Sequence, residues 1–180
     1  MLELKDLKKE FDGISVLDGI NISFKRGAKI GLSGGNGTGK STLLNIATGF
    51  LTAEEGSIIL NGDDVTSFEA WKFSRLGIKR TFQKARFNQA LILKEQLYTN
   101  DKIIRENLDM LEGAGIINYL YAFPNEIPLP ILRKAEVIRA LLASPNYVFL
   151  DEPSAGMSTS DLLEFGEFLK DYIDPKTCLI

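Results

Sequence analysis

Apolar and polar positions alternate through the first part of the chain, which is typical of β-strands that bury one face. The alternation covers residues 2–11 and resumes over residues 16–24. Between them, the Asp12-Gly13 pair favours a tight turn. The pattern therefore predicts two strands joined at this turn, with Phe11 at the end of the first.

A glycine-rich stretch lies between a short apolar run and the first helical pattern. Residues 29–32, Lys-Ile-Gly-Leu, are typical of a short buried strand. Apolar residues within 43–47 recur at helical spacing, which predicts a helix starting near Gly39. Gly49 is suited to end this helix, because glycine readily takes the left-handed conformation found there. The order of elements is therefore strand, loop and helix.

The middle of the chain predicts a second αβ unit. Glu54-Glu55-Gly56 favours a turn, and the apolar run over residues 57–60 predicts a strand after it. Residues 67–75 are compatible with a short helix. Residues 76–78 lead to residues 80–83, which are expected to be the end of a further strand where the sequence becomes polar.

Residues 88–122 change character, because apolar side chains recur there at mixed helical spacings. Breaks at Thr99-Asn100 and at residues 113–115 divide the stretch, so we predict a small helical insertion. Prolines at positions 124, 128 and 130 are expected to prevent a regular helix. The next helix is therefore predicted over about 132–143.

The last part of the chain predicts two strands with a helix between them. Residues 147–150 form a compact apolar run that ends in Asp151 and Glu152, the pattern of a buried parallel strand. The apolar spacing over residues 158–172 predicts a helix, and residues 177–180 predict the start of another strand.

Composition narrows the classes of function. A chain of 180 residues with net charge −3 fits one domain and lacks the basic field that binding to nucleic acid needs, so no nucleic acid is expected as a partner. There is no histidine, which excludes histidine-based triads and metal ligands. The single Cys178 has no second cysteine for an internal disulfide. No apolar run approaches the roughly 20 residues that span a bilayer.

The glycine-rich stretch carries the strongest chemical signal. Gly34, Gly39, Lys40 and Ser41 match the phosphate-loop pattern G-x-x-x-x-G-K-[ST]. Consecutive backbone N–H groups of such a loop curl around an anion, and the N-terminus of the following helix faces the same charge. We expect Lys40 to reach the β- and γ-phosphates of a nucleotide and Ser41 to hold Mg²⁺. The candidate nucleotide-binding residues in this stretch are Gly34, Gly35, Asn36, Gly37, Thr38, Gly39, Lys40, Ser41 and Thr42.

The acidic pair that ends the apolar strand is the second chemical signal. Asp151 is expected to hold the hydration shell of Mg²⁺ beside Ser41. Glu152 is the candidate to polarise the attacking water in phosphoryl hydrolysis. From the residues alone, Phe11 fits a core position and an adenine platform equally well.

These motifs resemble those of the ATP-binding subunit of ABC transporters, and the resemblance covers nearly the whole chain. Within that family the segments around Gln83 and Asp151 are most similar to the subfamily of branched-chain amino-acid importers and to the lipopolysaccharide exporter ATPase. The resemblance implies an α/β P-loop NTPase fold with a mainly parallel central sheet, an N-terminal antiparallel β portion and a small helical insertion. It also implies that Phe11 stacks on adenine and that Gln83 senses the γ-phosphate and joins the metal site.

Two departures from the family pattern stand out. Where the family carries a Leu-Ser-Gly-Gly-Gln-like signature, this chain has Ile-Pro-Leu-Pro-Ile over residues 127–131. The family's switch histidine, which follows the strand predicted at residues 177–180, is absent, and we interpret this as truncation. Proline removes a backbone N–H, so this signature is expected to complete a partner's site poorly.

The resemblance implies one ATP-binding domain over residues 1–180, with a nucleotide-binding core at 1–83 and 144–180 and a helical subdomain at about 88–143. The expected function is binding of MgATP, with hydrolysis that drives a membrane permease contacted through the helical subdomain. Expected partners are ATP, a second ATP-binding subunit in a homo- or heterodimer, and the permease, which would hold the chain on the cytoplasmic face of the membrane. The alternatives are a catalytically weak regulatory module and a soluble ABC-type ATPase without a permease.

Overall fold

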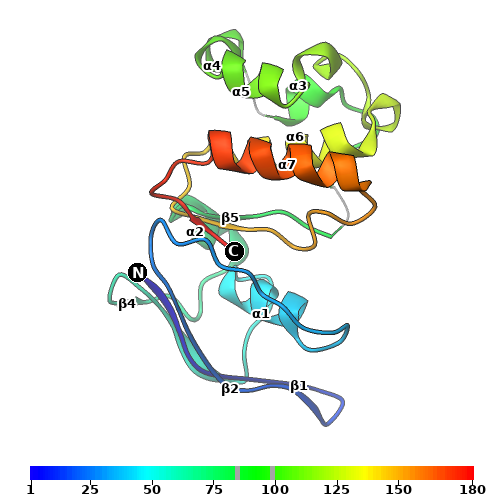
Figure 1. Ribbon diagram of the computed structural model, residues 1–180. Helices are drawn as coiled ribbons and strands as arrows, with labels where there is room; N and C mark the ends of the chain where they lie inside the picture. The colour runs from blue at the N-terminus through cyan, green and yellow to red at the C-terminus, as the bar shows by residue number, and fades with distance from the viewer. Residues whose placement is uncertain (84–85, 98–99) are drawn as a thin grey trace. The chain divides into compact units, whose positions relative to one another are not determined.

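The computed structural model describes residues 1–83, 86–97 and 100–180. The chain divides into two compact units (Figure 1). Unit 1 contains Met1–Arg80, Pro145–Asp151 and Pro175–Ile180, and unit 2 contains Thr81–Ser144 and Glu152–Asp174. Within the described ranges, every helix is too short or too polar to cross a lipid bilayer.

Unit 1 contains an antiparallel sheet in the order β2-β1-β3-β4. The two predicted strands are present as β1 (Leu2–Phe11) and β2 (Ile14–Phe24), and both residues of the Asp12-Gly13 turn have positive φ. Leu2, Leu4 and Leu7 of β1 are buried, as the alternation requires. In Figure 1 these two strands run side by side as a long hairpin.

The third strand corrects one expectation. β3 (Glu55–Leu60) pairs antiparallel with β1 and is followed by β4 (Asp63–Asp64), so it extends the first sheet and starts no second αβ unit. Glu55 and Gly56, predicted to lie in a turn, belong to β3. Gly56 has φ +96°, and a Cβ there would lie 2.4 Å from the carbonyl oxygen of Lys5. Glycine is required here because the two backbones approach so closely.

Unit 1 also contains a parallel sheet in the order β5-β6-β7. Its strands are β5 (Ile78–Arg80), β6 (Tyr147–Phe149) and β7 (Cys178–Leu179), and β6 is fully buried, as predicted. The predicted strand over residues 29–32 was too long, because only Lys29 forms a bridge, parallel to Leu179.

Two helices complete unit 1. α1 (Lys40–Ala47) begins directly after Gly39 and buries its apolar residues, and Gly49 after it has φ +75°, as predicted. α2 (Ala70–Arg75) lies within the predicted helix 67–75. A Cβ at Gly49 would lie 2.5 Å from the ring of Phe73 in α2, so glycine also permits close packing between these segments.

Unit 2 contains the predicted helical insertion. The described helices of unit 2 are α3 (Leu93–Gln96), α4 (Asp101–Glu106), α5 (Leu108–Gly113), the 3₁₀ turns η1 (Ile117–Tyr119) and η2 (Pro124–Glu126), α6 (Leu129–Leu141) and α7 (Thr159–Tyr172). Of these, α7 follows the predicted insertion in the sequence. Thr99, predicted as part of a break, lies outside the described residues, whereas the Asn100 side chain caps α4. Ser158 caps α7 in the same way, and that helix has the predicted extent.

The start of α6 corrects a second expectation. The helix begins at Leu129, three residues before the predicted start at 132, and contains Pro130 in its first turn. Proline is tolerated there because the first N–H groups of a helix have no intrahelical partner. The predicted antiparallel portion, parallel sheet and helical insertion are all present, so the expected α/β architecture is confirmed.

Candidate nucleotide-binding site

The loop between β2 and α1 has the backbone expected of a phosphate cradle. Gly37 and Gly39 have φ +76° and +87°, and a Cβ at Gly39 would lie 2.8 Å from the carbonyl oxygen of Val16. Only glycine fits such a position without displacement of the neighbouring strand. Residues 34–38 are exposed, and Thr38 Oγ1 donates to the Gly35 carbonyl at 2.9 Å, which closes the loop on itself.

Lys40 brings a positive charge to this loop. Its Nζ donates to the carbonyl oxygens of Gly34 and Gly35, at 2.7 Å each. The ammonium group therefore lies against the same loop whose N–H groups are the candidate phosphate ligands. The predicted nucleotide-binding residues 34–42 are contiguous, so they lie together in the loop and the first turn of α1.

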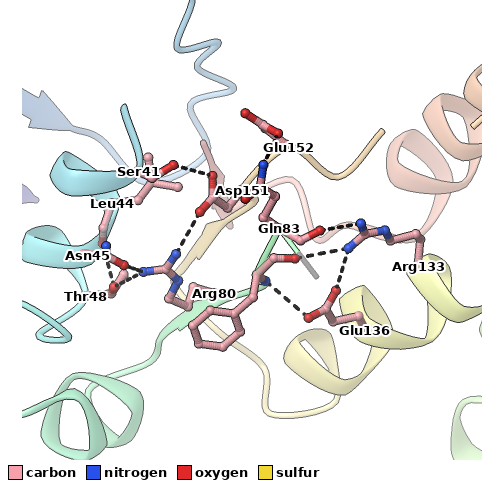
Figure 2. A network of polar contacts seen from close by, with 11 residues as sticks. Ser41, Leu44, Asn45, Thr48, Arg80, Gln83, Arg133, Glu136, Asp151 and Glu152 are labelled. Carbon is pink, nitrogen blue, oxygen red and sulfur yellow. Dashed lines mark hydrogen bonds and ion pairs between the residues drawn. The ribbon is translucent and has the colours of Figure 1, made fainter. Parts of the chain in front are cut away.

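The first turn of α1 contacts the end of the buried strand. Ser41 Oγ donates to Asp151 Oδ1 at 3.2 Å, as Figure 2 shows. A hydroxyl and a carboxylate are the hard oxygen ligands that Mg²⁺ prefers. The donor set that unit 1 places at the phosphate loop therefore fits a magnesium ion.

Arg80 is a residue of this cluster that sequence reasoning missed. Its Nη2 pairs with Asp151 Oδ2 at 3.1 Å, and its Nη1 donates to Asn45 Oδ1 at 2.6 Å and to Thr48 Oγ1 at 3.3 Å (Figure 2). The signal in the sequence was a cation at the end of a short predicted strand. The pairing of this strand with β6, which sets Arg80 opposite Phe149, comes from the structure.

Glu152, the candidate to polarise the attacking water, and Gln83, which the resemblance also counts among the catalytic residues, contact one another within unit 2. Gln83 Nε2 donates to Glu152 Oε2 at 2.8 Å, and both side chains are exposed (Figure 2). Glu152 has φ +47°, a left-handed conformation that is uncommon for residues other than glycine. This backbone, directly after Asp151, turns the chain out of the buried strand and leaves the carboxylate accessible.

A buried pair on α6 holds the backbone beside Gln83. Arg133 donates to the carbonyl oxygens of Phe82, at 3.1 Å, and of Gln83, while Glu136 Oε1 accepts from the Phe82 N–H at 3.2 Å. Burial raises the pKa of the Glu136 carboxyl above its usual value, an effect opposed by the Phe82 N–H and the Arg133 guanidinium. Sequence reasoning missed this pair. The sequence does show two opposite charges three positions apart in a largely apolar helix, a spacing at which side chains can pair.

Phe11 is not a core residue. Its side chain is 45% exposed at the end of β1, and the Lys9 ammonium lies 5.2 Å from the centroid of its ring. The core alternative left open by the sequence is therefore wrong. An accessible ring remains compatible with stacking on a base.

The segment at residues 127–131 forms the start of α6. Pro128 is the N-cap residue, no side chain caps the helix, and Pro130 lies in the first turn. Proline carries no N–H, so this helix start offers fewer backbone donors than one built from glycine and serine.

Comparison with known proteins gives the same picture as the geometry. The family model described as "ABC transporter" matches residues 17–155. An ABC transporter ATP-binding protein of Rhizobium meliloti is 33% identical over 162 residues, covering 85% of this chain and 60% of that protein. The probable branched-chain amino acid transport ATP-binding protein LivG of Methanocaldococcus jannaschii is 31% identical over 179 residues, covering 88% of this chain and 70% of that protein.

Solved structures agree with the sequence comparisons. A nucleotide-free ATP-binding cassette from an ABC transporter superposes with a TM-score of 0.80 at 27% identity, covering 94% of this chain and 76% of that one. An ATP-binding cassette in its ADP conformation gives a TM-score of 0.84 at 25% identity, covering 99% and 79%. The resemblance predicted from the motifs is confirmed. With its phosphate loop, acidic strand end and helical insertion, the chain belongs to the ABC transporter family and contains the P-loop ATP-binding fold of that family.

Proposed function

We propose that this chain binds ATP together with Mg²⁺ at residues 34–42 and acts as the ATP-binding subunit of a membrane transporter. The observation that carries the proposal is the 3.2 Å contact between Ser41 Oγ and Asp151 Oδ1 at the end of the phosphate loop. It supports the proposal because a hydroxyl and a carboxylate, both candidate Mg²⁺ ligands, lie together at the end of the loop. The chain spans 60% of the length of its Rhizobium relative, so the activity of a whole transporter subunit is part of the proposal.

Each part of the loop has a distinct task in binding. The N–H groups of residues 34–39 and the N-terminus of α1 would bind the phosphate oxygens. Lys40 Nζ would exchange its contacts with the Gly34 and Gly35 carbonyls for contacts with the β- and γ-phosphates. Ser41 and Asp151 would hold Mg²⁺, with Gln83 proposed as a further ligand. When bound, Mg²⁺ supplies positive charge that offsets the charge of the phosphates. The exposed ring of Phe11 would stack on adenine.

Glu152 is the proposed general base for hydrolysis. Its exposed carboxylate would accept a proton from a water molecule as that water attacks the γ-phosphate. Gln83 already donates to one of the two carboxylate oxygens, so it orients the group and leaves the other oxygen for the water. A residue that contacts both the base and the γ-phosphate would link ATP binding to the readiness of the base.

The second ATP-binding subunit is proposed to be a different protein. In a homodimer both sites would face Pro128 and Pro130, which lack the backbone N–H groups that glycine would supply. Loss of such a contact to the γ-phosphate is expected to slow hydrolysis about a hundredfold or more. We propose that unit 2 contacts a membrane permease, which would hold the complex at the cytoplasmic face of the membrane; the name of the LivG relative supports a role in transport.

Calorimetric titration with ATP in the presence of Mg²⁺ tests the binding step. Lys40→Ala is expected to weaken binding by about 10- to 100-fold, since a hydrogen bond to a charged group contributes about 1.5–3 kcal/mol. Lys25→Ala, at an exposed position in the turn after β2, is the matched control and should bind like the unaltered chain. Equal affinity of the Lys40→Ala variant and the control would overturn the proposed site.

The steady-state rate of phosphate release distinguishes an ATPase that drives transport from a regulatory module that only binds ATP. The chain alone is expected to turn over slowly, and a partner subunit with an intact signature is expected to increase the rate. Tight ATP binding without turnover under either condition would favour a regulatory module that switches contacts on binding ATP.

A further inference from the structure

We propose that Arg80 is a positioning residue for the magnesium site, one that fixes the Asp151 carboxylate relative to Ser41. The inference rests on the proposed function, because it concerns how the same site binds Mg²⁺ together with ATP. It adds a buried cation that makes no proposed contact with the nucleotide or the metal ion. All of the residues involved belong to unit 1.

The two oxygens of the Asp151 carboxylate have different partners. Oδ2 pairs with Arg80 Nη2 at 3.1 Å, and Oδ1 accepts from Ser41 Oγ at 3.2 Å (Figure 2). The side chains of Arg80 and Asp151 are only 4% and 11% exposed, so water contributes little to fixing either group. With Oδ2 held by the guanidinium, rotation of the carboxylate is restricted and Oδ1 remains directed at Ser41.

The same guanidinium also forms hydrogen bonds with residues of the helix that carries Ser41 and of its C-cap. Arg80 Nη1 donates to Asn45 Oδ1 at 2.6 Å and to Thr48 Oγ1 at 3.3 Å. Asn45 and Thr48 lie four and seven positions after Ser41. This spacing places Asn45 on the same face of α1 as Ser41, and Thr48, the C-cap residue, follows on that side. Arg80 therefore binds both sides of the site, the carboxylate and the helix face that bears the hydroxyl.

Strand pairing explains why Arg80 can reach both partners. β5 runs parallel to β6, with Arg80 opposite Phe149, two positions before Asp151. The preceding residue, Lys79, donates instead to Ser74 Oγ, because successive side chains of a strand point to opposite faces. The planar fork of arginine binds two partners in fixed directions, whereas the single ammonium of lysine cannot reproduce this geometry.

The expected consequence concerns the coupling between Mg²⁺ and ATP. The affinity for ATP without Mg²⁺ is expected to depend on the phosphate loop, whereas the hydrogen bonds described for Arg80 go to Asn45, Thr48 and Asp151. The gain in affinity when Mg²⁺ is added depends on the geometry of Ser41 and Asp151. A positioning role for Arg80 therefore predicts loss of the gain alone.

The experiment measures the dissociation constant for ATP with excess Mg²⁺ and with EDTA, and takes the ratio of the two. In Arg80→Met the Mg²⁺-dependent gain should fall by about 10-fold or more, the size of effect found when residues that orient metal ligands are removed. Arg80→Lys keeps the charge but loses the fork, and should lose a substantial part of the gain. Lys79→Met is the matched control from the same strand and should retain the gain in full.

Circular dichroism of each variant separates misfolding from loss of position. If Arg80→Met fails to fold, Asn45→Ala, which removes one anchor and keeps the ion pair, provides the test and should reduce the gain by a smaller factor. An unchanged ratio in the folded Arg80 variants, or an equal weakening with and without Mg²⁺, would overturn the inference and leave Arg80 a purely structural residue. Absence of ATP binding by the unaltered chain would overturn the proposed function itself and this inference with it.

Discussion

The two polar clusters of this chain are built in opposite ways. In unit 1, the side chains of Ser41 and Arg80 each contact the Asp151 carboxylate, and the arginine and aspartate side chains are buried. In unit 2, Gln83 and Glu152 contact one another at the surface. There, Arg133 and Glu136 of α6 bind the backbone of Phe82 and Gln83, and the Gln83 side chain donates to Glu152.

This difference suggests a division of labour. In unit 1 the buried side chains of Arg80 and Asp151 fix one another beside the exposed Ser41 of α1, and such a preformed arrangement suits groups that bind phosphate and metal. The side chains of Gln83 and Glu152 are exposed, so they can reorient at low cost when a nucleotide or partner contacts them. Unit 1 therefore has the construction expected of a preformed binding site, whereas the Gln83–Glu152 pair of unit 2 has that of a group that can change its contacts.

The largest effect is expected from a variant that tests whether α6 fixes the backbone of Phe82 and Gln83. Arg133→Met leaves the Glu136 carboxylate buried without its cation, and is expected to lower the free energy of unfolding by about 3 kcal/mol or more. Lys134→Met is the matched control, because Lys134 is also buried but pairs at 3.7 Å with the exposed Glu164. Urea unfolding should show a loss of under about 1 kcal/mol for the control. Equal losses in the two variants would show that Arg133 has no special role.

The second effect tests the surface pair. Glu152→Gln keeps the shape of the side chain but removes the proposed base, so hydrolysis by the native assembly should slow by about a hundredfold or more. Binding of MgATP should be retained, since residues 34–42 are unaltered. Phosphate release and equilibrium binding measure the two steps separately. Turnover close to that of the unaltered protein would rule out Glu152 as the base.

A smaller effect is expected at the far end of the loop that carries Glu152. The Ser158 hydroxyl accepts from the Asp161 N–H at 3.2 Å and caps α7, so Ser158→Ala should cost about 1 kcal/mol of stability. Ser154→Ala alters an exposed serine of the same loop and should change stability by less than about 0.5 kcal/mol. Thermal or urea unfolding compares them, and a larger loss in Ser154→Ala would contradict this description of the loop.

The smallest effect is a change in the pH dependence of stability. Because burial raises the pKa of Glu136 in the folded chain, the folded state holds this proton more tightly than the unfolded state does. The contribution of Glu136 to stability therefore falls as pH rises from its ordinary pKa through its raised value. Glu136→Gln should flatten this part of the profile, as urea unfolding at several pH values from about 4 to about 7 would reveal. An unchanged profile would argue against a raised pKa.

Local chemistry made much of the fold predictable. Glycine at position 39 fixed the start of α1, the apolar run before Asp151 identified β6, and Ser158 marked the start of α7. Each of these signals is contained in a short segment. The strand predicted at residues 29–32 depended instead on a distant partner, β7, and was reduced to a single bridge.

The same reasoning explains which parts of the candidate site were missed. The phosphate loop and the acidic pair are read from adjacent residues, so they could be proposed from the sequence. Arg80 and Arg133 read as ordinary surface cations, because their burial depends on carboxylates and carbonyls that lie far away along the chain. Pro130 was read as a helix breaker, although the first turn of a helix accepts proline.

The central claim is that unit 1 joins the phosphate loop and Asp151 into one site for MgATP. The most direct test is titration of ATP into the unaltered chain and the Asp151→Asn variant, each with Mg²⁺ and with EDTA. We predict that Mg²⁺ strengthens ATP binding by the unaltered chain and that Asp151→Asn loses most of this gain while its affinity in EDTA is largely kept. An equal gain from Mg²⁺ in both proteins would contradict the claim.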